Sequence, residues 1–149
     1  MNNKNKISIL ISNYNKSKFL SQTLSMFKKQ SYQNFEVILF DDVSDDNSLE
    51  IIKKFRNIKL IMNKKKKFSF AALNQINALN ECFKISKGQI ICLLDADDYF
   101  NKNKLTVLKS YFLKKRISMP YLIYQLKDTV LLRKNLKIKK RYKKIFGRQ

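Results

Sequence analysis

Glycine and long apolar runs are scarce in this chain of 149 residues. The two glycines, Gly88 and Gly147, cannot form the G-x-G-x-x-G turn that holds the pyrophosphate of a dinucleotide, which excludes that class of site. No apolar run approaches the ~20 residues that span a bilayer, and the apolar part of the start, ISILIS, is too short for a signal peptide. We therefore expect a protein that is made and kept in the cytoplasm.

Cysteines and acidic residues are also few. Cys82 and Cys92 lie in apolar segments without the spacing of metal ligands, so we expect buried, reduced thiols rather than a disulfide or a metal pair. The chain has 32 basic and 11 acidic residues, a formal net charge of +21, and after Asp98 its single acidic residue is Asp128. Such a basic tail is attracted to nucleic acid or to the anionic face of a membrane, and lysine-rich codon usage is the alternative explanation.

Apolar segments of strand length alternate with segments of helical periodicity, in a chain long enough for one domain with its own core. These strands lack a clean polar alternation, which favours an α/β fold with a mostly parallel sheet and helices on both faces. We divide the chain into a domain of residues 1–115 and a basic strand and helix tail, residues 116–149. The expected strands are residues 7–12, 35–40, 58–62 and 89–94, with further candidates at 120–126 and 128–133; the expected helices are residues 16–30, a segment that ends at Phe55, and residues 70–86, 101–115 and 136–146.

Polar segments follow each of the first four expected strands. In parallel α/β sheets, ligands bind outside the carboxyl ends of the strands. We therefore expect two acidic clusters and one basic loop to converge on one edge of the sheet, although they are far apart in the sequence. The segments at this edge are Ser12–Asn15, Asp41–Asp46, Asn63–Lys67 and Asp95–Asp98.

The segment QIICLLDADDYF, residues 89–100, ends a buried strand with three carboxylates, Asp95, Asp97 and Asp98. Residues i and i+2 of an extended segment point the same way, so Asp95 and Asp97 can address one ligand. Carboxylates this close resist ionisation unless a positive group binds between them, and Mg²⁺ or Mn²⁺ prefers oxygen ligands. The alternative is that Asp97 or Asp98 caps the helix expected from residue 101.

The other polar side chains at this edge also have two interpretations each. Asp41 and Asp42 are either turn and cap residues or acceptors for hydrogen bonds from a base or ribose. The run Lys64–Lys67 is either solvated or meets a diphosphate. Tyr14 either stacks on a flat ring or covers the core.

Three motifs, in this order and at these separations, resemble the nucleotide-binding half of family 2 glycosyltransferases of the GT-A fold. They are ISILISNYN, FEVILFDDVSDDNS and KGQIICLLDADDYF, and FAALNQINALNECFKISKG resembles the family's helix before the metal strand, which carries an A-x-N-x-G/A pattern. The resemblance covers roughly residues 5–115. It implies an enzyme of cell-envelope polysaccharide synthesis that transfers a sugar, with inversion, from a nucleotide diphosphate sugar.

The resemblance also implies roles for individual residues. Ser12 and Tyr14 match the turn that contacts the nucleobase, and Asp42 matches the carboxylate that binds the base. Asp95 and Asp97 match the D-x-D, in which the last aspartate coordinates Mn²⁺ or Mg²⁺ on the diphosphate and the first approaches the ribose or sugar. The metal would stabilise the departing nucleoside diphosphate. We count Asp41 with the nucleotide-binding residues.

This chain departs from the family pattern at four points. Ser12-Asn13 replaces the family's P-T or P-x pair, and the loop after the third strand offers only lysines and Phe68 where the family has an arginine. Val43 stands where the family has glycine, and because a β-branched residue resists positive φ, we expect a reshaped loop. The aspartate that serves inverting members as general base lies downstream of the D-x-D, and we do not assign that role to Asp128. We therefore leave the catalytic residues unassigned and expect a truncated protein, in which the GT-A fold is incomplete at its acceptor half.

Two functions follow from these features. The first is a family 2 glycosyltransferase whose acceptor, given the basic tail, is anionic or lipid-linked at the inner face of the membrane, with nucleic acid an unfavoured partner. The alternative is an inactive GT-A remnant that binds nucleic acid or a membrane surface. The acidic edge opposes the alternative, because its carboxylates repel phosphates unless a metal is bound. A phosphatase that uses the segment DAD is excluded by the order of the motifs.

Overall fold

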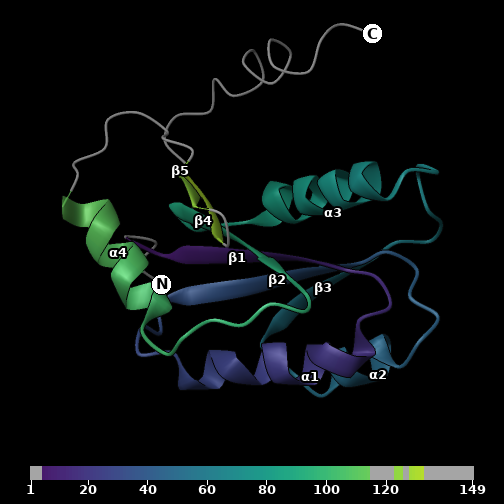
Figure 1. The fold of residues 1–149 in the computed structure, drawn as a ribbon, viewed down its shortest axis with the longest axis horizontal. Coiled ribbons are helices and arrows are strands. Elements are labelled where there is room, and N and C mark those ends of the chain that lie inside the picture. The colour runs from purple at the N-terminus through teal and green to yellow at the C-terminus, as the bar shows by residue number, and fades with distance from the viewer. Residues whose placement is uncertain (1–4, 115–122, 126–127, 133–149) are drawn as a thin grey trace, which may run out of the picture.

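The computed structural model describes residues 5–114, 123–125 and 128–132. Its centre is a six-stranded sheet with the order β3-β2-β1-β4-β6-β5 (Figure 1). The four strands predicted in the first 100 residues are parallel, β6 runs antiparallel to β4, and β5 runs antiparallel to β6. The mostly parallel sheet is thus confirmed. The strands are β1 (Ile7–Asn13), β2 (Phe35–Asp41), β3 (Ile58–Met62), β4 (Ile90–Asp95), β5 (Ile123–Gln125) and β6 (Asp128–Leu132).

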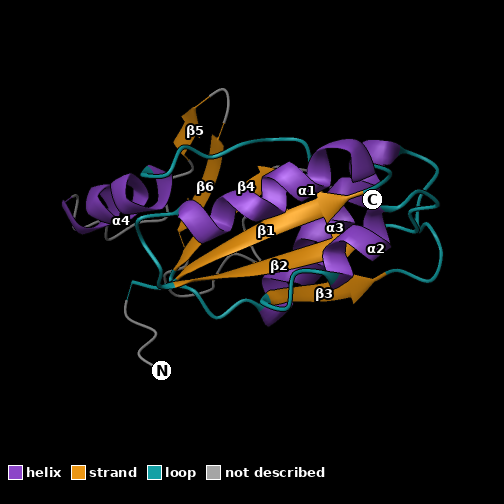
Figure 2. Ribbon diagram, turned by 90° about the horizontal axis from the view of Figure 1, so that it is seen from below, coloured by secondary structure: helices purple, strands orange, loops and turns teal. Residues whose placement is uncertain are grey.

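Helices cover both faces of the sheet, as predicted (Figures 1 and 2). The first and second helices lie on one face and the third on the other. The expected helix over residues 16–30 is a short α-helix that continues as a 3₁₀ turn. The helices are α1 (Ser17–Ser25), the 3₁₀ helix η1 (Met26–Lys29), α2 (Ser48–Lys53), α3 (Ala71–Ile85) and α4 (Lys104–Lys114).

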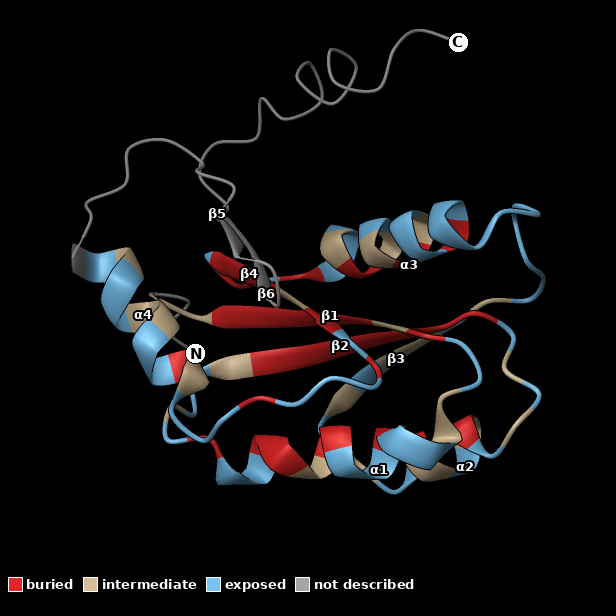
Figure 3. Ribbon diagram, viewed as in Figure 1, coloured by how far each residue is buried: buried red, intermediate tan, exposed pale blue. Residues whose placement is uncertain are grey.

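Two apolar clusters form the core, one on each face of the sheet (Figure 3). Successive side chains of a strand point to opposite faces, and both sets are apolar along the central strands. Ile7, Ile9 and Ile11 pack with α1 and α2, whereas Leu10 packs with Ala78 of α3. A strand that is apolar on both sides needs cover on both sides, which explains the missing polar alternation.

The register of the sheet aligns the carboxyl ends of the strands. Ser12 lies opposite Asp95, and Asn13 lies opposite Asp41. Asp41 in turn lies opposite Met62, the last residue of β3. The polar segments that follow these strands therefore share one edge, as the sequence predicts.

Cys82 and Cys92 are both buried, as expected, and no disulfide joins them. Burial raises the pKa of the Cys82 thiol to about 12, which keeps it protonated. Within the part of the chain that the structure describes, no helix combines the length and apolar character needed to cross a bilayer. The predicted basic helix at residues 136–146 lies outside the described residues, and the division of the chain at residue 115 stays a prediction.

Candidate functional site

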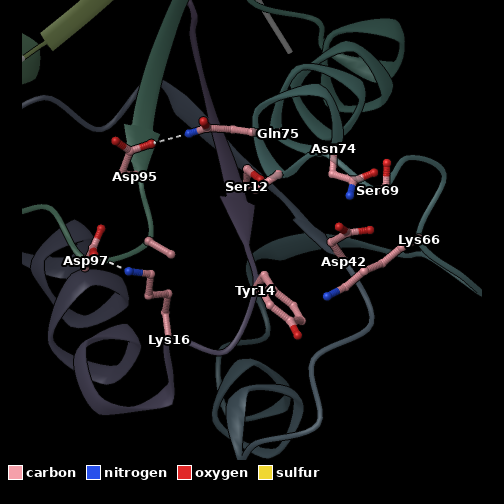
Figure 4. A pocket seen from close by; sticks show the side chains of 12 residues that line it. Ser12, Tyr14, Lys16, Asp42, Lys66, Ser69, Asn74, Gln75, Asp95 and Asp97 are labelled. Carbon is pink, nitrogen blue, oxygen red and sulfur yellow. Dashed lines mark hydrogen bonds and ion pairs between the residues drawn. The ribbon is translucent and has the colours of Figure 1, made fainter.

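A cavity of about 440 Å³ opens at the carboxyl ends of β1, β2 and β4 (Figure 4). Its walls are the turn after β1, the end of β2, the loop between β3 and α3, the first turn of α3 and the end of β4. Five of the six residues predicted to bind nucleotide or metal line it. The polar lining residues are Ser12, Tyr14, Lys16, Asp42, Lys66, Ser69, Asn74, Gln75, Asp95 and Asp97.

Asp95 and Asp97 both line this cavity and are exposed to solvent. Gln75 Nε2 donates to Asp95 Oδ1 over 2.9 Å, and Lys16 Nζ lies 2.6 Å from Asp97 Oδ2. The hydrogen bond between Lys16 and Asp97 holds the pKa of Asp97 below its usual value and raises the pKa of Lys16. Because α4 begins at Lys104, Asp97 faces the cavity rather than the start of that helix.

A hydroxyl of α1 fixes the backbone between these carboxylates. Thr23 Oγ1 donates toward the carbonyl oxygens of Ala96, at 3.0 Å, and Asp98, at 3.1 Å. The Asp98 amide donates to the Asp95 carbonyl oxygen over 3.0 Å, which closes a tight turn. The positions of Asp95 and Asp97 are thus set by backbone contacts, and their side chains remain available to the cavity.

The structure separates the roles of Asp41 and Asp42. Asp42 lines the cavity, and its Oδ1 accepts a hydrogen bond of 2.7 Å from Asn63 Nδ2. Asp41 is buried behind it, where its carboxylate accepts hydrogen bonds from Asn13 Nδ2 and from the hydroxyl and amide of Ser44. Asp41 therefore shapes the loop after β2, and of the two aspartates Asp42 is the one that lines the cavity.

The expectation of a reshaped loop at Val43 is wrong. Val43 has a φ of 61°, so the turn keeps the left-handed backbone conformation that a glycine would adopt there. The hydrogen bonds of Asp41 with Ser44, on either side of Val43, hold the turn in this strained form.

Tyr14 and Lys66 face each other across one wall of the cavity. Lys66 Nζ lies 3.5 Å from the centroid of the Tyr14 ring, a cation–π contact. The ring is 43% exposed, so Tyr14 belongs to the cavity rather than covering the core. Lys66 is the member of the run Lys64–Lys67 that lines the cavity.

The loop that carries Lys66 is tied to α3 by a buried amide. Asn74 Nδ2 donates to the carbonyl oxygen of Phe68 over 2.8 Å, and Asn74 Oδ1 accepts from the Phe68 amide over 2.9 Å. The side chain of Asn74 thus satisfies both the backbone amide and the backbone carbonyl of Phe68. This contact orients the basic loop toward the cavity.

Sequence reasoning missed four polar lining residues: Lys16, Ser69, Asn74 and Gln75. Asn74 carried a signal, since it is the asparagine of the A-x-N pattern already recognised in this helix. Lys16 and Gln75 carried none, because their partners lie 81 and 20 residues away and the pairing depends on the folded sheet.

The carboxylates present suit a cation that is only partly coordinated by protein. Among the described residues, no group of three or more histidine, cysteine, aspartate or glutamate side chains is placed to enclose a metal ion. Mg²⁺ and Mn²⁺ accept such sites, since one or two carboxylates plus substrate phosphates and water complete their shell. Asp95 and Asp97, at the rim of an open cavity, fit this donor set.

The sequence matches the family model described as glycosyl transferase family 2 over residues 8–148. The sequence is 34% identical over 122 residues to WfgD of Escherichia coli, a UDP-Glc:alpha-D-GlcNAc-diphosphoundecaprenol beta-1,3-glucosyltransferase. This match covers 80% of this chain and 46% of that protein. It is 36% identical over 104 residues to the amylovoran biosynthesis glycosyltransferase AmsB of Erwinia amylovora, covering 66% of this chain and 33% of that protein.

Solved structures show the same fold. The crystal structure of Staphylococcus aureus TarS 1–349 in complex with UDP-GlcNAc superposes with a TM-score of 0.65 at 27% identity, over 74% of this chain and 32% of that one. The mannosyltransferase PcManGT of Pyrobaculum calidifontis, in complex with GDP-Man and Mn²⁺, superposes with a TM-score of 0.59 at 18% identity. This superposition covers 69% of this chain and 31% of that one.

These relatives are all glycosyltransferases, and they give no support to the alternative of an inactive remnant. The chain spans less than half of their length. Its sheet and helices form part of the GT-A fold. The chain belongs to glycosyltransferase family 2.

Proposed function

We propose that the cavity binds the nucleotide diphosphate sugar of an inverting glycosyl transfer. The observation that supports this most directly is the convergence of Asp42, Asp95, Asp97, Tyr14 and Lys66 on one opening. Each side chain offers a contact that a nucleotide sugar needs. An ionised carboxylate accepts from a base or a ribose, an aromatic ring stacks on a base, and an ammonium group binds a phosphate.

Within this proposal Asp42, Ser12 and Tyr14 hold the base, and Asp95 accepts from the ribose or sugar. Asp97, assisted by Asp95, holds Mn²⁺ or Mg²⁺ on the diphosphate. When bound, this cation would neutralise charge that develops on the leaving group. Lys66 extends the positive wall on the other side of the diphosphate. Asp41 positions the loop that carries Asp42.

We further propose that the chain is the donor-binding half of such an enzyme. Asp128 begins β6 and pairs with Gln125 of β5, and we assign it no role as general base. Among the relatives, WfgD acts on alpha-D-GlcNAc-diphosphoundecaprenol, and TarS is a poly(ribitol-phosphate) beta-N-acetylglucosaminyltransferase. A lipid-linked or anionic acceptor also suits the basic tail of this chain.

Isothermal titration calorimetry of UDP-sugars and GDP-sugars, with and without Mn²⁺, tests the donor site. We expect Mn²⁺ to tighten binding of one of these donors to the wild-type chain at least about tenfold. Asp97→Ala should abolish this gain, because it removes a carboxylate ligand of the cation. Glu50→Ala, which removes an exposed carboxylate of α2 outside the cavity, is the matched control. Absence of donor binding in every metal condition contradicts the proposed function.

The surface beside the cavity suggests contact with an anionic membrane from its cytoplasmic side. The loop between β3 and α3 carries four lysines, Lys64–Lys67, and no acidic residue. The lysines of the loop before α3 are exposed, and so are Phe70, Leu73 and Ile76, which are spaced three residues apart at the start of that helix. Basic and apolar side chains on one surface are the combination that binds anionic lipid.

Sedimentation with vesicles tests this contact. We expect binding to phosphatidylglycerol vesicles and much weaker binding to phosphatidylcholine vesicles. The double substitution Lys64→Glu, Lys65→Glu should weaken it about thirtyfold, since each of the two lysines near the surface adds about 1 kcal/mol. Lys53→Glu, Lys54→Glu, at the C-terminal end of α2 across the sheet, serves as control. If both pairs of substitutions have the same effect, the surface beside the cavity is not the contact.

A further inference from the structure

Lys16 occupies an unusual place in the cavity. It comes from the turn after β1, where its carbonyl oxygen accepts the first hydrogen bonds of α1, from Phe19 and Leu20. Its ammonium lies 2.6 Å from Asp97 Oδ2, and the two side chains are 42% and 36% exposed. The negative charge of Asp95 also acts on this ammonium. A cation that the chain itself supplies therefore stands beside the D-x-D carboxylates.

A purely structural role does not account for this pair. The loop around Asp97 is already fixed through its backbone, by the hydroxyl of Thr23 and by the turn from Asp95 to Asp98. Ion pairs with this degree of exposure contribute little to stability. What the ammonium does provide is a positive charge that offsets the mutual repulsion of the carboxylates.

We propose that Lys16 is an internal counter-ion of Asp97, one that holds the place of the divalent cation and moves to the donor diphosphate when that cation binds. This inference rests on the proposed function. Asp97 Oδ2 cannot contact both an ammonium at 2.6 Å and a divalent cation without strong repulsion between the two positive charges. The Lys16 side chain is long and half exposed, and it ends in the cavity where the diphosphate would lie.

The consequence is a coupling between the two ligands. A cation that arrives alone must displace Lys16 and leave its ammonium without a partner, so it binds weakly. A cation that arrives with a diphosphate gives Lys16 a new anion, so it binds more tightly. The site would then favour the cation–diphosphate complex over the free cation, and this coupling is reciprocal.

Titration with Mn²⁺, followed by the electron paramagnetic resonance signal of the free ion, tests this coupling. Lys16→Met keeps an unbranched side chain that is one atom shorter and removes its charge. Without nucleotide, we expect Lys16→Met to bind Mn²⁺ about three- to tenfold more tightly than wild type. With saturating UDP, corrected for Mn²⁺ that UDP binds in free solution, the gain in affinity that UDP brings should shrink by a similar factor.

Two further variants make the result specific. Lys18, two residues after Lys16, has its ammonium over the Phe19 ring. Lys18→Met removes the same charge at this position, and its Mn²⁺ affinity should stay within about twofold of wild type. Lys16→Gln should reproduce Lys16→Met. Unchanged or weaker Mn²⁺ binding by both Lys16 variants overturns the counter-ion proposal.

Asp97→Ala in the same titration separates this proposal from the proposed function. If Asp97→Ala loses Mn²⁺ binding while the Lys16 variants resemble wild type, only the counter-ion proposal fails. If Asp97→Ala binds Mn²⁺ as wild type does, Asp97 is not a ligand of the cation. The proposed metal site and the counter-ion proposal then both fail.

Discussion

The two ends of the parallel sheet place carboxylates in opposite surroundings. At the amino ends of the strands, Glu36 of β2 is 8% exposed and accepts hydrogen bonds from the hydroxyl of Ser8, the amide of Lys87 and the ammonium of Lys59. Lys6 Nζ lies 3.6 Å from the same carboxylate. At the carboxyl ends, Asp95 and Asp97 are exposed at the rim of a cavity.

This difference shows how to tell a structural carboxylate from one that binds a ligand. Burial alone would raise the pKa of Glu36, but the hydrogen bonds from Lys59, Ser8 and the Lys87 amide outweigh it and lower that pKa to about 2. These donors surround the carboxylate on both oxygens, so its charge serves the fold. Asp95 and Asp97 have oxygens that face solvent, so their charge is available to a ligand.

The largest effect should come from the amino end, at Gly88. A Cβ placed on Gly88 would lie 2.5 Å from the Ser8 backbone nitrogen and 2.6 Å from its hydroxyl, which donates to Glu36. Gly88→Ala must therefore separate β4 from β1, and we expect it to lower the free energy of unfolding by about 3 kcal/mol in urea denaturation. Lys87→Ala, which alters an exposed neighbour, is the control. Ordinary surface substitutions change the free energy of unfolding by less than about 0.5 kcal/mol. An equally small change for Gly88→Ala would contradict this close packing.

A somewhat smaller effect should appear on acidification. The pKa of Glu36 is about 2 in the folded chain and near 4.5 in the unfolded chain, so its contribution to stability is complete above about pH 4.5 and is lost as the pH falls toward 2. We expect wild type to lose about 2 to 3 kcal/mol more than Glu36→Gln between pH 6 and pH 2. Equal losses for both proteins, measured by urea denaturation across this range, would show that Glu36 is not selectively stabilised as an anion.

The smallest effect concerns the carboxyl end, where strain rather than packing is expected. Val43 is 39% exposed and has a φ of 61°, a conformation that costs a β-branched residue about 1 to 3 kcal/mol. Val43→Gly should raise the free energy of unfolding by about 1 kcal/mol, after the entropy cost of glycine is subtracted. Val43→Ala, which keeps a Cβ, should recover only part of this gain. A lower thermal midpoint for Val43→Gly would show that the turn is not strained.

The sheet and most of the site were predictable because they depend on local pattern. The strand at residues 58–62 was predicted with its observed bounds, and the other three early strands to within one residue. Strand order aligned Ser12, Asp42 and Asp95 because parallel strands end at one edge. The helix expected from residue 101 begins at Lys104, after a turn in which the Asn101 side chain accepts from the Asn103 amide.

What could not be predicted depends on side chains from distant segments. Asp41 and Asp42 are neighbours of the same type, and only the contact of Asn13 with Asp41 shows which of them turns away from the cavity. The pairing of Lys16 with Asp97 requires the turn after β1 to meet the end of β4. The prediction for Val43 was wrong because it rested on the preference of a β-branched residue for negative φ. The hydrogen bonds between Asp41 and Ser44, which impose the turn, were not considered.

The contact between Thr23 and the backbone of Ala96 and Asp98 also dictates when the site forms during folding. The residues that it joins are separated by 73 and 75 positions in the chain. Such non-local contacts bear the entropy of closing a long loop and form late in folding. During synthesis, β1, α1 and β2 can pair early, whereas the loop that carries Asp97 can take its shape only after residue 98 has been made and β4 has joined β1. A ribosome-bound chain arrested before that point would have a partial sheet and no cavity.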